Sequence, residues 1–204
     1  MISFKKKFIF VHVPKTGGTS IEHALRAYSD GYSGHRTLKS QIQTVIESGE
    51  NPDEYYKFGV VRNPWDIVVS HYFYIKMEKS YWHSNDGTTT YGKHPDHDFV
   101  KNLSFKKFVY ALRDGKIKNK KTRKSQSYWL NDELDYIIRF ENLSAGYKKV
   151  CEDIGIPYEP LPLLNPSKHK AFHRHHNEDT LKIIHKLYID DIKRFKFAKP
   201  ILKS

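Results

Sequence analysis

Residues 8–28 contain a short apolar run, a turn with two glycines and a run of helical spacing in direct succession. Phe8 to Val13 has the β-branched and aromatic composition of a strand that is buried on both faces of a parallel sheet. The turn extends from Pro14 to Gly18. Apolar residues then recur at helical spacing, at Ile21, Ala24, Leu25 and Tyr28. A strand, a turn and a helix in this order favour an α/β fold.

The rest of the chain continues this alternation of strands and helices. Tyr55 to Val61 and Asp135 to Phe140 are predicted to be the second and third strands. Helices are predicted from Thr37 to Ser48, from Pro64 onward, after Ser104, from Leu143 to Ile154 and from Leu181 to Phe195. We therefore expect a P-loop-like three-layer α/β fold, with a central parallel sheet flanked by helices, in a single domain over residues 1–204.

Two polar segments and one cysteine stand apart from this pattern. Residues 80–100 have no clean period and are expected to form a long loop on the substrate side of the domain. Lys116 to Lys124 is a basic run, for which a solvated loop is favoured over a contact with an acidic substrate. Cys151, the single cysteine, lies on the apolar stripe of a predicted helix, so we expect a buried core thiol.

The turn between the first strand and the first helix has the composition of an anion site. Glycines allow a tight turn that presents backbone N–H groups, and a helix start adds N–H donors and the positive end of a dipole. Lys15 adds a full charge, and hydroxyl donors follow at Thr16, Thr19 and Ser20. An ordinary surface turn is the weaker interpretation, because such motifs are recognised by this strand–turn–helix context.

The order of residues in this turn differs from that of a Walker A loop. The Walker A motif reads G-x-x-x-x-G-K-[ST], with lysine after the last glycine. Here Lys15 precedes Gly17 and Gly18, and Arg62 follows the second strand where a magnesium-binding aspartate would be expected. The order disfavours an ATPase or GTPase. A P-loop kinase-like phosphotransferase with an unusual loop remains an alternative.

Five stretches of the chain, in order, resemble one known family. They are Ile9 to Ile21, Arg62 to Tyr72, Arg139 to Leu143, Leu164 to Lys168 and Tyr188 to Phe197. The first resembles the 5′-phosphosulfate loop of sulfotransferases that use 3′-phosphoadenosine-5′-phosphosulfate (PAPS), in particular those of the carbohydrate and bacterial type. The second resembles the 3′-phosphate segment of that family, and the other three are less specific. The resemblance covers nearly the whole chain.

The resemblance implies a soluble enzyme that transfers a sulfuryl group from PAPS to an acceptor hydroxyl and releases adenosine 3′,5′-bisphosphate, without a metal. In this family pattern, Lys15 would contact the 5′-phosphate and the bridging oxygen, while Arg62 and Ser70 would hold the 3′-phosphate. The 5′-phosphosulfate would lie against Thr16, Gly17, Gly18, Thr19 and Ser20. The position of Arg62 agrees, because open parallel sheets bind ligands beyond their strand ends and a guanidinium binds phosphate in a bidentate manner.

Transfer to a hydroxyl requires a base, and the sequence offers three candidates. Lys15 and His35 are the predicted catalytic residues: Lys15 stabilises the charge on the leaving oxygen, and His35 takes the proton of the hydroxyl. His35 lies in a glycine-flanked segment, and an ordinary histidine has a pKa of about 6.5, which suits a base at neutral pH. Glu22 and His71 remain open as alternatives. His12 is interpreted as a structural residue that bonds to the loop.

The charge of the chain favours anionic partners. The formal net charge is +12, from 35 basic and 23 acidic side chains. A basic nucleic-acid-binding module, with Trp82 and Tyr91 stacking on bases, is therefore a second alternative. We favour the enzyme, with no nucleic-acid partner, because the sharpest motif is a compact anion site and not a basic stripe.

The sequence also leads to expectations about the cellular location, metal binding and the acceptor. No apolar run approaches the length of about 20 residues that a membrane span needs, so we expect no transmembrane segment and a cytoplasmic location. The twelve histidines include His94, His97 and the run from His173 to His176, which we interpret as loop residues and not as metal ligands. The resemblance points to a saccharide or glycolipid as the acceptor, and the residues alone do not select one.

Overall fold

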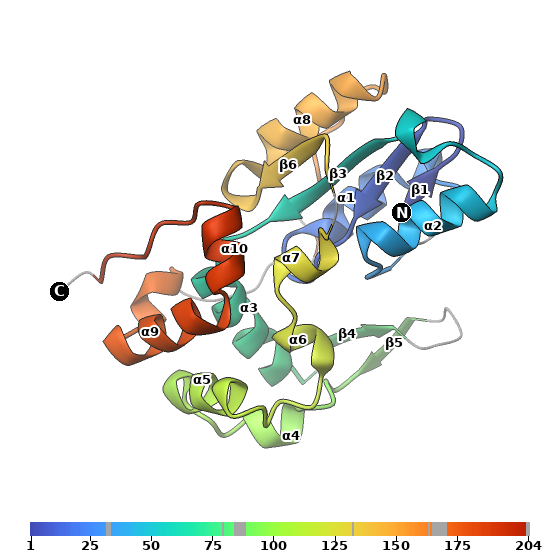
Figure 1. Ribbon diagram of the computed structural model, residues 1–204. Helices are drawn as coiled ribbons and strands as arrows, with labels where there is room; N and C mark the ends of the chain where they lie inside the picture. Colours follow the sequence, from blue (N-terminus) through green and yellow to red (C-terminus); the bar gives the residue numbers. More distant parts are fainter. Residues whose placement is uncertain are drawn as a thin grey trace. The chain divides into compact units, whose positions relative to one another are not determined.

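The computed structural model describes residues 1–31, 34–78, 80–83, 89–131, 133–162, 164 and 171–202. The chain divides into two compact units, each composed of two separate segments (Figure 1). The first unit contains Met1–Arg62 and Ser125–Pro166, and the second contains Asn63–Lys124 and Ser167–Ser204. The chain therefore passes from one unit to the other three times.

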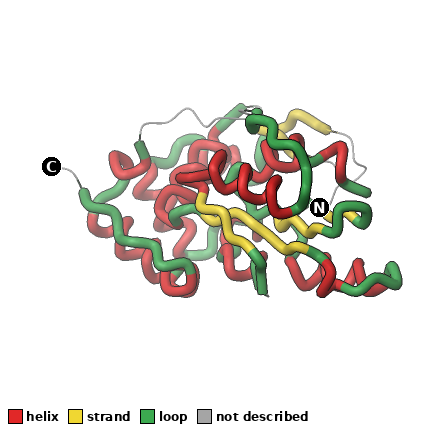
Figure 2. The backbone as a smooth tube through the Cα atoms, turned by 90° about the horizontal axis from the view of Figure 1, so that it is seen from above, coloured by secondary structure: helices red, strands yellow, loops and turns green. Residues whose placement is uncertain are grey.

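A four-stranded sheet forms the centre of the first unit. Its order is β1 (Ile2–Ser3), β2 (Phe8–Val11), β3 (Tyr56–Val61) and β6 (Tyr136–Arg139), and Figure 2 shows these strands in yellow. β2, β3 and β6 run parallel, while β1 pairs antiparallel with β2. The register aligns Val11 with Gly59 and Val61 with Arg139, so the carboxyl ends of the parallel strands meet at one edge.

Helices pack on the sheet of the first unit because successive strand residues point to opposite faces. One face packs on α1 (Gly18–Ala24) and α8 (Leu143–Asp153). This core contains Phe8, Phe10, Phe58, Val60, Ile138, Ile21, Leu25, Tyr147 and Val150, among others. The opposite face is occupied by α2 (Leu38–Glu47) and by Leu130, which follows α7 (Gln126–Trp129) and lies directly over Gly59.

The expected class is therefore confirmed: the protein is an α/β protein with a mostly parallel four-stranded sheet flanked by helices. The three predicted parallel strands are present, and the sequence missed the two-residue β1. Cys151 is buried in the core between α8 and the sheet, as predicted, and burial raises the pKa of its thiol. The likeness to a P-loop fold and the single domain stay predictions.

The second unit is mainly helical. α3 (Pro64–Lys76), α5 (Phe105–Arg113) and α9 (Glu178–Leu187) pack together. Trp65, fully buried at the start of α3, donates from its indole nitrogen to the Leu181 carbonyl at 3.1 Å. The shorter helices of this unit are α4 (His97–Val100), α6 (Lys120–Arg123) and α10 (Ile189–Arg194). The short 3-10 helices of the chain are η1 (Arg26–Tyr28), η2 (Pro52–Glu54), η3 (Phe140–Asn142) and η4 (Phe172–His175).

Three segments differ from the sequence prediction. The expected long loop over residues 80–100 contains a hairpin, β4 (Ser80–His83) and β5 (Thr89–Gly92), followed by α4. The hairpin was missed because its strands have no apolar alternation. The single closing helix is interrupted at Tyr188, which separates α9 from α10, and α9 begins earlier, at the Asn177 capping box. The basic run includes one helical turn, α6, in place of an irregular loop.

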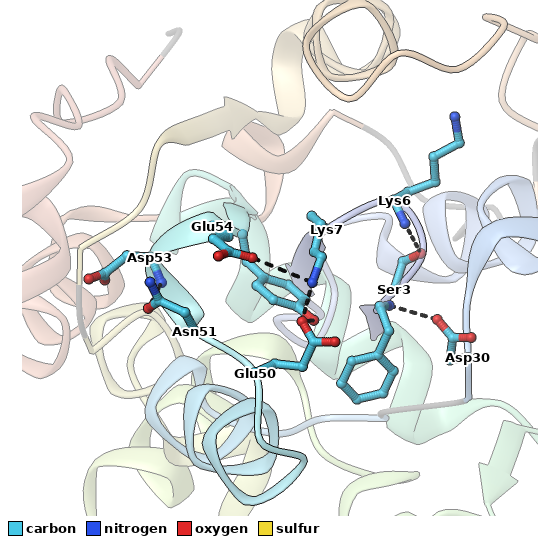
Figure 3. A network of polar contacts seen from close by, with 10 residues as sticks. Ser3, Lys6, Lys7, Asp30, Glu50, Asn51, Asp53 and Glu54 are labelled. Carbon is cyan, nitrogen blue, oxygen red and sulfur yellow. Dashed lines mark hydrogen bonds and ion pairs between the residues drawn. The ribbon is translucent and has the colours of Figure 1, made fainter.

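A polar network closes the amino edge of the sheet, opposite the edge where parallel sheets bind ligands (Figure 3). Lys7, just before β2, pairs with Glu50 and lies 3.5 Å from Glu54, and the Tyr55 hydroxyl donates to Glu50 at 3.2 Å. The Phe4 amide donates to Asp30 at 2.7 Å. Solvent-exposed ion pairs of this kind contribute little to the free energy of folding. The network joins the segments that enter the strands at this edge.

Candidate functional site

The glycine turn connects β2 to α1 with a sharply folded backbone. Lys15 has a φ of +66° and Gly17 a φ of +82°, so both lie in the left-handed region. Lys15 is not a glycine, and this conformation is strained for a residue with a side chain. The buried Thr16 hydroxyl donates to the Val13 carbonyl at 2.9 Å, which ties the turn to the end of the strand. The Thr16 hydroxyl therefore stabilises the turn from inside.

The first turn of α1 begins without a side-chain cap. Its N-cap residue is Gly17, which has no side-chain oxygen to accept from the N–H groups of the turn. Gly18 is required for a different reason: a Cβ built there would lie 2.0 Å from Cδ2 of His12. The His12 ring therefore lies directly against the backbone of the loop. Of the hydroxyl residues, Ser20 is buried and Thr19 is half-buried.

Arg62, directly after β3, reaches the same turn. Its side chain is buried, with 7 % exposed, and Nη1 donates to the Lys15 carbonyl at 3.0 Å. Its guanidinium lies 4.0 Å from the centre of the Phe140 ring, a distance typical of a cation–π contact. Its backbone is held by Gln126: the Arg62 N–H donates to Oε1 at 2.8 Å, and Nε2 donates to the Arg62 carbonyl at 2.9 Å. Contacts to both the guanidinium and the backbone thus fix this residue.

The third strand contributes the apolar wall of the turn. A Cβ at Gly17 would lie 2.9 Å from Cδ2 of Leu143 and 3.2 Å from Cε2 of Phe140. Phe140 thus contacts both the glycine turn and the Arg62 guanidinium. Three stretches that are far apart in the sequence, namely the turn, Arg62 and residues 139–143, therefore meet at the carboxyl edge of the sheet.

The two cations of the site lie close together. The Lys15 amine is partly buried, and this burial, together with the neighbouring Arg62 charge, lowers the pKa of Lys15 to about 8. Each cause disfavours the charged amine. An anion in the turn would reverse both effects. The arrangement is chemically suited to hold an anion with more than one negative charge.

His35, His12 and Glu22 form a cluster beside the turn. His35 Nδ1 lies 2.9 Å from the His12 carbonyl oxygen, and the two rings are 4.3 Å apart, centre to centre. His12 Nδ1 lies 2.9 Å from Oε2 of Glu22, which is buried with 8 % exposed. The Trp129 ring lies 6.1 Å from the ring of His35. Glu22, one of the alternative bases, is thus buried against His12.

The remaining predicted residues lie in the second unit or outside the described residues. Ser70 is buried, with 1 % exposed, and His71 is also buried; both are on α3. Of the stretch Leu164 to Lys168, only Leu164 is described. The structure therefore brings Lys15, Arg62 and the glycine turn together. Ser70 belongs to the other unit.

Three histidines of the second unit have structural partners. His94 Nδ1 accepts from the Asp96 N–H at 3.0 Å, and His97 Nδ1 donates to the Ile75 carbonyl at 2.9 Å. His176 lies between the Trp65 carbonyl and the Thr180 hydroxyl, and burial lowers its pKa to about 4. In the described part of the chain, no three His, Cys, Asp or Glu side chains are grouped closely enough to hold a metal.

A sequence model of the sulfotransferase family matches residues 1–198. The chain belongs to the sulfotransferase family. The match includes every segment of the site described above and extends through both compact units. No curated protein matches the chain in a sequence comparison. None of the helices within the described ranges has the length and apolarity of a membrane-spanning segment.

Membership of this family supports sulfuryl transfer, with a hydroxyl as the acceptor, as the reaction of the chain. Two contributors to the site were missed from the sequence as site residues. Gln126 has no local pattern that reveals its pairing with Arg62, because that pairing joins residues 64 positions apart. Phe140 was singled out only as part of a weak match, and nothing in the sequence placed its ring against Arg62.

Proposed function

We propose that this sulfotransferase transfers the sulfuryl group of PAPS to an acceptor hydroxyl and releases adenosine 3′,5′-bisphosphate. One observation carries the proposal: Lys15 and Arg62 converge on one glycine turn at the carboxyl edge of a parallel sheet. A donor with phosphate groups at both ends of its ribose needs two fixed cations. A single lysine on a surface turn would not explain a buried arginine bonded to the same backbone.

The residues of the turn fit such a donor. The left-handed φ of Gly17 and the uncapped start of α1 leave N–H groups for an anion in place of a side-chain cap. The low pKa of Lys15 reflects burial and the neighbouring Arg62 charge, and the negative charge of a bound anion would counteract both. In the proposal, Thr16, Gly17, Gly18, Thr19 and Ser20 hold the 5′-phosphosulfate. Arg62 binds the 3′-phosphate, and Ser70 is proposed as its second partner.

The donor supplies an activated sulfuryl group, and the residues of the chain stabilise the charges that its transfer creates. The acceptor oxygen forms a bond to sulfur while the bond from sulfur to the bridging oxygen breaks. The electron pair of that bond stays on the 5′-phosphate oxygen, where the Lys15 ammonium and the N–H groups of the turn stabilise it. His35 takes the proton of the hydroxyl, so that no charge remains on the product oxygen.

His35 is the preferred base among the three candidates. A neutral imidazole can accept a proton at neutral pH, whereas the Glu22 carboxylate lies against His12 and is directed away from solvent. His71 is buried on a helix of the other unit. A saccharide or glycolipid is the proposed acceptor, on the strength of the resemblance of the loop to those of carbohydrate sulfotransferases.

Calorimetric titration with adenosine 3′,5′-bisphosphate tests the donor. Because the 3′-phosphate would pair with Arg62, the bisphosphate should bind far more tightly than AMP. Arg62→Ala should remove this difference, with a loss of about 10- to 100-fold in affinity. Lys15→Ala should weaken binding of both nucleotides, since both carry the 5′-phosphate. Lys39→Ala, a change at an exposed lysine on α2, is the matched control and should leave both affinities unchanged.

Three outcomes would contradict the proposal. Tighter binding of ATP–magnesium than of the bisphosphate would favour a kinase-like phosphotransferase. Equal binding of AMP and the bisphosphate would remove the role of Arg62. Strongly salt-dependent binding of single-stranded nucleic acid that survives Lys15→Ala would favour the basic binding module.

A further inference from the structure

The contact between His35 and the His12 backbone fixes the protonation pattern of the proposed base. A carbonyl oxygen can only accept, so His35 Nδ1, 2.9 Å from the His12 carbonyl, must carry the proton. In the neutral ring, Nε2 then holds the lone pair. The basic nitrogen of His35 is thus selected by the backbone of the residue that links β2 to the glycine turn.

The side chain of His12 lies between this base and a buried carboxylate. One side of the ring faces His35, with the ring centres 4.3 Å apart, and Nδ1 lies 2.9 Å from Oε2 of Glu22. Both Glu22 and His12 are less than one-tenth exposed. The approach of Nδ1 to Oε2 is close but poorly aligned for a hydrogen bond, and Oε1 of Glu22 has no hydrogen-bond partner among the described residues.

An incompletely bonded carboxylate under a catalytic cluster requires an explanation. Burying a carboxylate without full hydrogen bonding costs free energy, and packing alone would favour an apolar residue on this face of α1. The His12 ring is also constrained by α1, because it lies so close to Gly18 that no side chain would fit at position 18. The ring therefore has little freedom to move away from either Glu22 or His35.

We infer that Glu22 and His12 are positioning residues that orient His35 and stabilise the charged ring it acquires when it takes a proton. This inference rests on the proposed role of His35 as the base. The negative charge of Glu22 lies behind His12, on the side away from the turn, and favours an imidazolium form in the cluster. In many enzymes a carboxylate contacts the histidine base directly and orients it. Here the Glu22 carboxylate would act on His35 through the His12 ring, which lies between them.

Other charged groups also act on the cluster. Lys15 belongs to the same turn, and its charge disfavours an imidazolium nearby. The Met1 amino group interacts electrostatically with Glu22 and with Arg36, and burial lowers the pKa of that amine to about 4. Arg36 is engaged by Ser40 and Thr44 of α2.

Nuclear magnetic resonance of the ligand-free protein tests the inference without an acceptor. The imidazole ¹⁵N shifts report the tautomer of His35, and its Cε1–H shift against pH gives the titration midpoint. In Glu22→Gln, the midpoint should move to lower pH by roughly one unit, while the Nδ1–H tautomer, which the His12 carbonyl selects, should persist. Glu152→Gln, the same change at an exposed position of α8, should alter neither.

A second variant guards against a fold defect in the first. His12→Phe keeps a ring over Gly18 but removes the nitrogen that faces Glu22, and should produce the same direction of shift at His35. The backbone amide spectrum shows whether each variant is folded. An unchanged His35 midpoint in both folded variants would overturn the inference.

The same samples separate this inference from the proposed function. Glu22→Gln should bind adenosine 3′,5′-bisphosphate within about twofold of the parent, because neither Glu22 nor His12 is proposed to touch the donor. Should the bisphosphate fail to bind the parent protein while the His35 shift occurs, the donor assignment is wrong and the positioning effect stands. Should the bisphosphate bind as proposed without any His35 shift, the positioning role alone fails.

Discussion

At the scale of single residues, the site combines backbone strain with crowded positive charge. Lys15 has a left-handed backbone although it has a side chain, and its amine lies near a second cation. Strain of this kind costs about 1–3 kcal/mol and persists only where the surroundings enforce it. Here the bond from Arg62 to the Lys15 carbonyl is one such constraint. The turn is therefore preorganised for anion binding.

The lowered pKa of Lys15 makes anion binding depend on pH. The folded pKa of about 8 lies below the ordinary value, so the ligand-free amine loses its charge as the pH rises through 8. The affinity for adenosine 3′,5′-bisphosphate should fall by about tenfold between pH 7 and 9. Titration calorimetry at several pH values measures this. Lys15→Arg, always charged, should show no such fall, and an equally flat parent would refute the argument.

Substitution of Gly18 should lower the stability of the protein, because an added Cβ would collide with the His12 ring. Gly18→Ala should lower the free energy of unfolding by about 1–3 kcal/mol, as expected for overpacking, measured by urea denaturation. Gly31→Ala is the control, since a Cβ there would meet no atom within 4 Å. Equal stability of the two variants would mean that His12 moves aside at no cost.

At the scale of elements, one short helix holds the second cation in place. α7 has a single turn, and its first residue, Gln126, makes both bonds to the Arg62 backbone. Gln126→Ala leaves two buried backbone groups without these partners. The change should cost about 1–3 kcal/mol of stability and should weaken binding of adenosine 3′,5′-bisphosphate, since Arg62 loses its anchor.

The control for Gln126→Ala is a glutamine with an exposed side chain. Gln43 lies on an exposed face of α2, where it donates to Glu47 at 3.1 Å. Gln43→Ala should change stability by less than about 0.5 kcal/mol and leave the bisphosphate affinity as it is. A Gln126→Ala variant that behaves like Gln43→Ala would show that Arg62 needs no anchor from α7.

Elements were predictable where a local pattern determines them. β2, β3 and β6 are apolar runs with breaking residues around them, and α2 has Thr37 as its N-cap and one apolar face, so sequence and structure agree there. The hairpin of β4 and β5 and the break at Tyr188 have no such local pattern, because tertiary contacts decide them. The same holds in the site: Lys15 is evident from its motif, whereas the burial of Glu22 under His12 depends on packing.

At the scale of the whole molecule, neither compact unit is a continuous stretch of chain. Both the sheet-containing unit and the helical unit consist of two segments, so neither segment alone carries a complete core. The family match also runs through both units without a division between them. These facts support a single domain in which the units fold together, and that remains a prediction.

Unfolding of the two units can be followed separately because each contains a tryptophan, Trp129 in the first and Trp65 in the second. Trp129 is retained alone by Trp65→Phe with Trp82→Phe, and Trp65 is retained alone by Trp129→Phe with Trp82→Phe. In each variant, the fluorescence transition in urea should coincide with that of far-UV circular dichroism, as expected for one cooperative unit. Comparison within each variant removes the effect of the substitutions on stability. Separated transitions in either variant would mean that the chain has two domains, with the Lys15–Arg62 site entirely in the first.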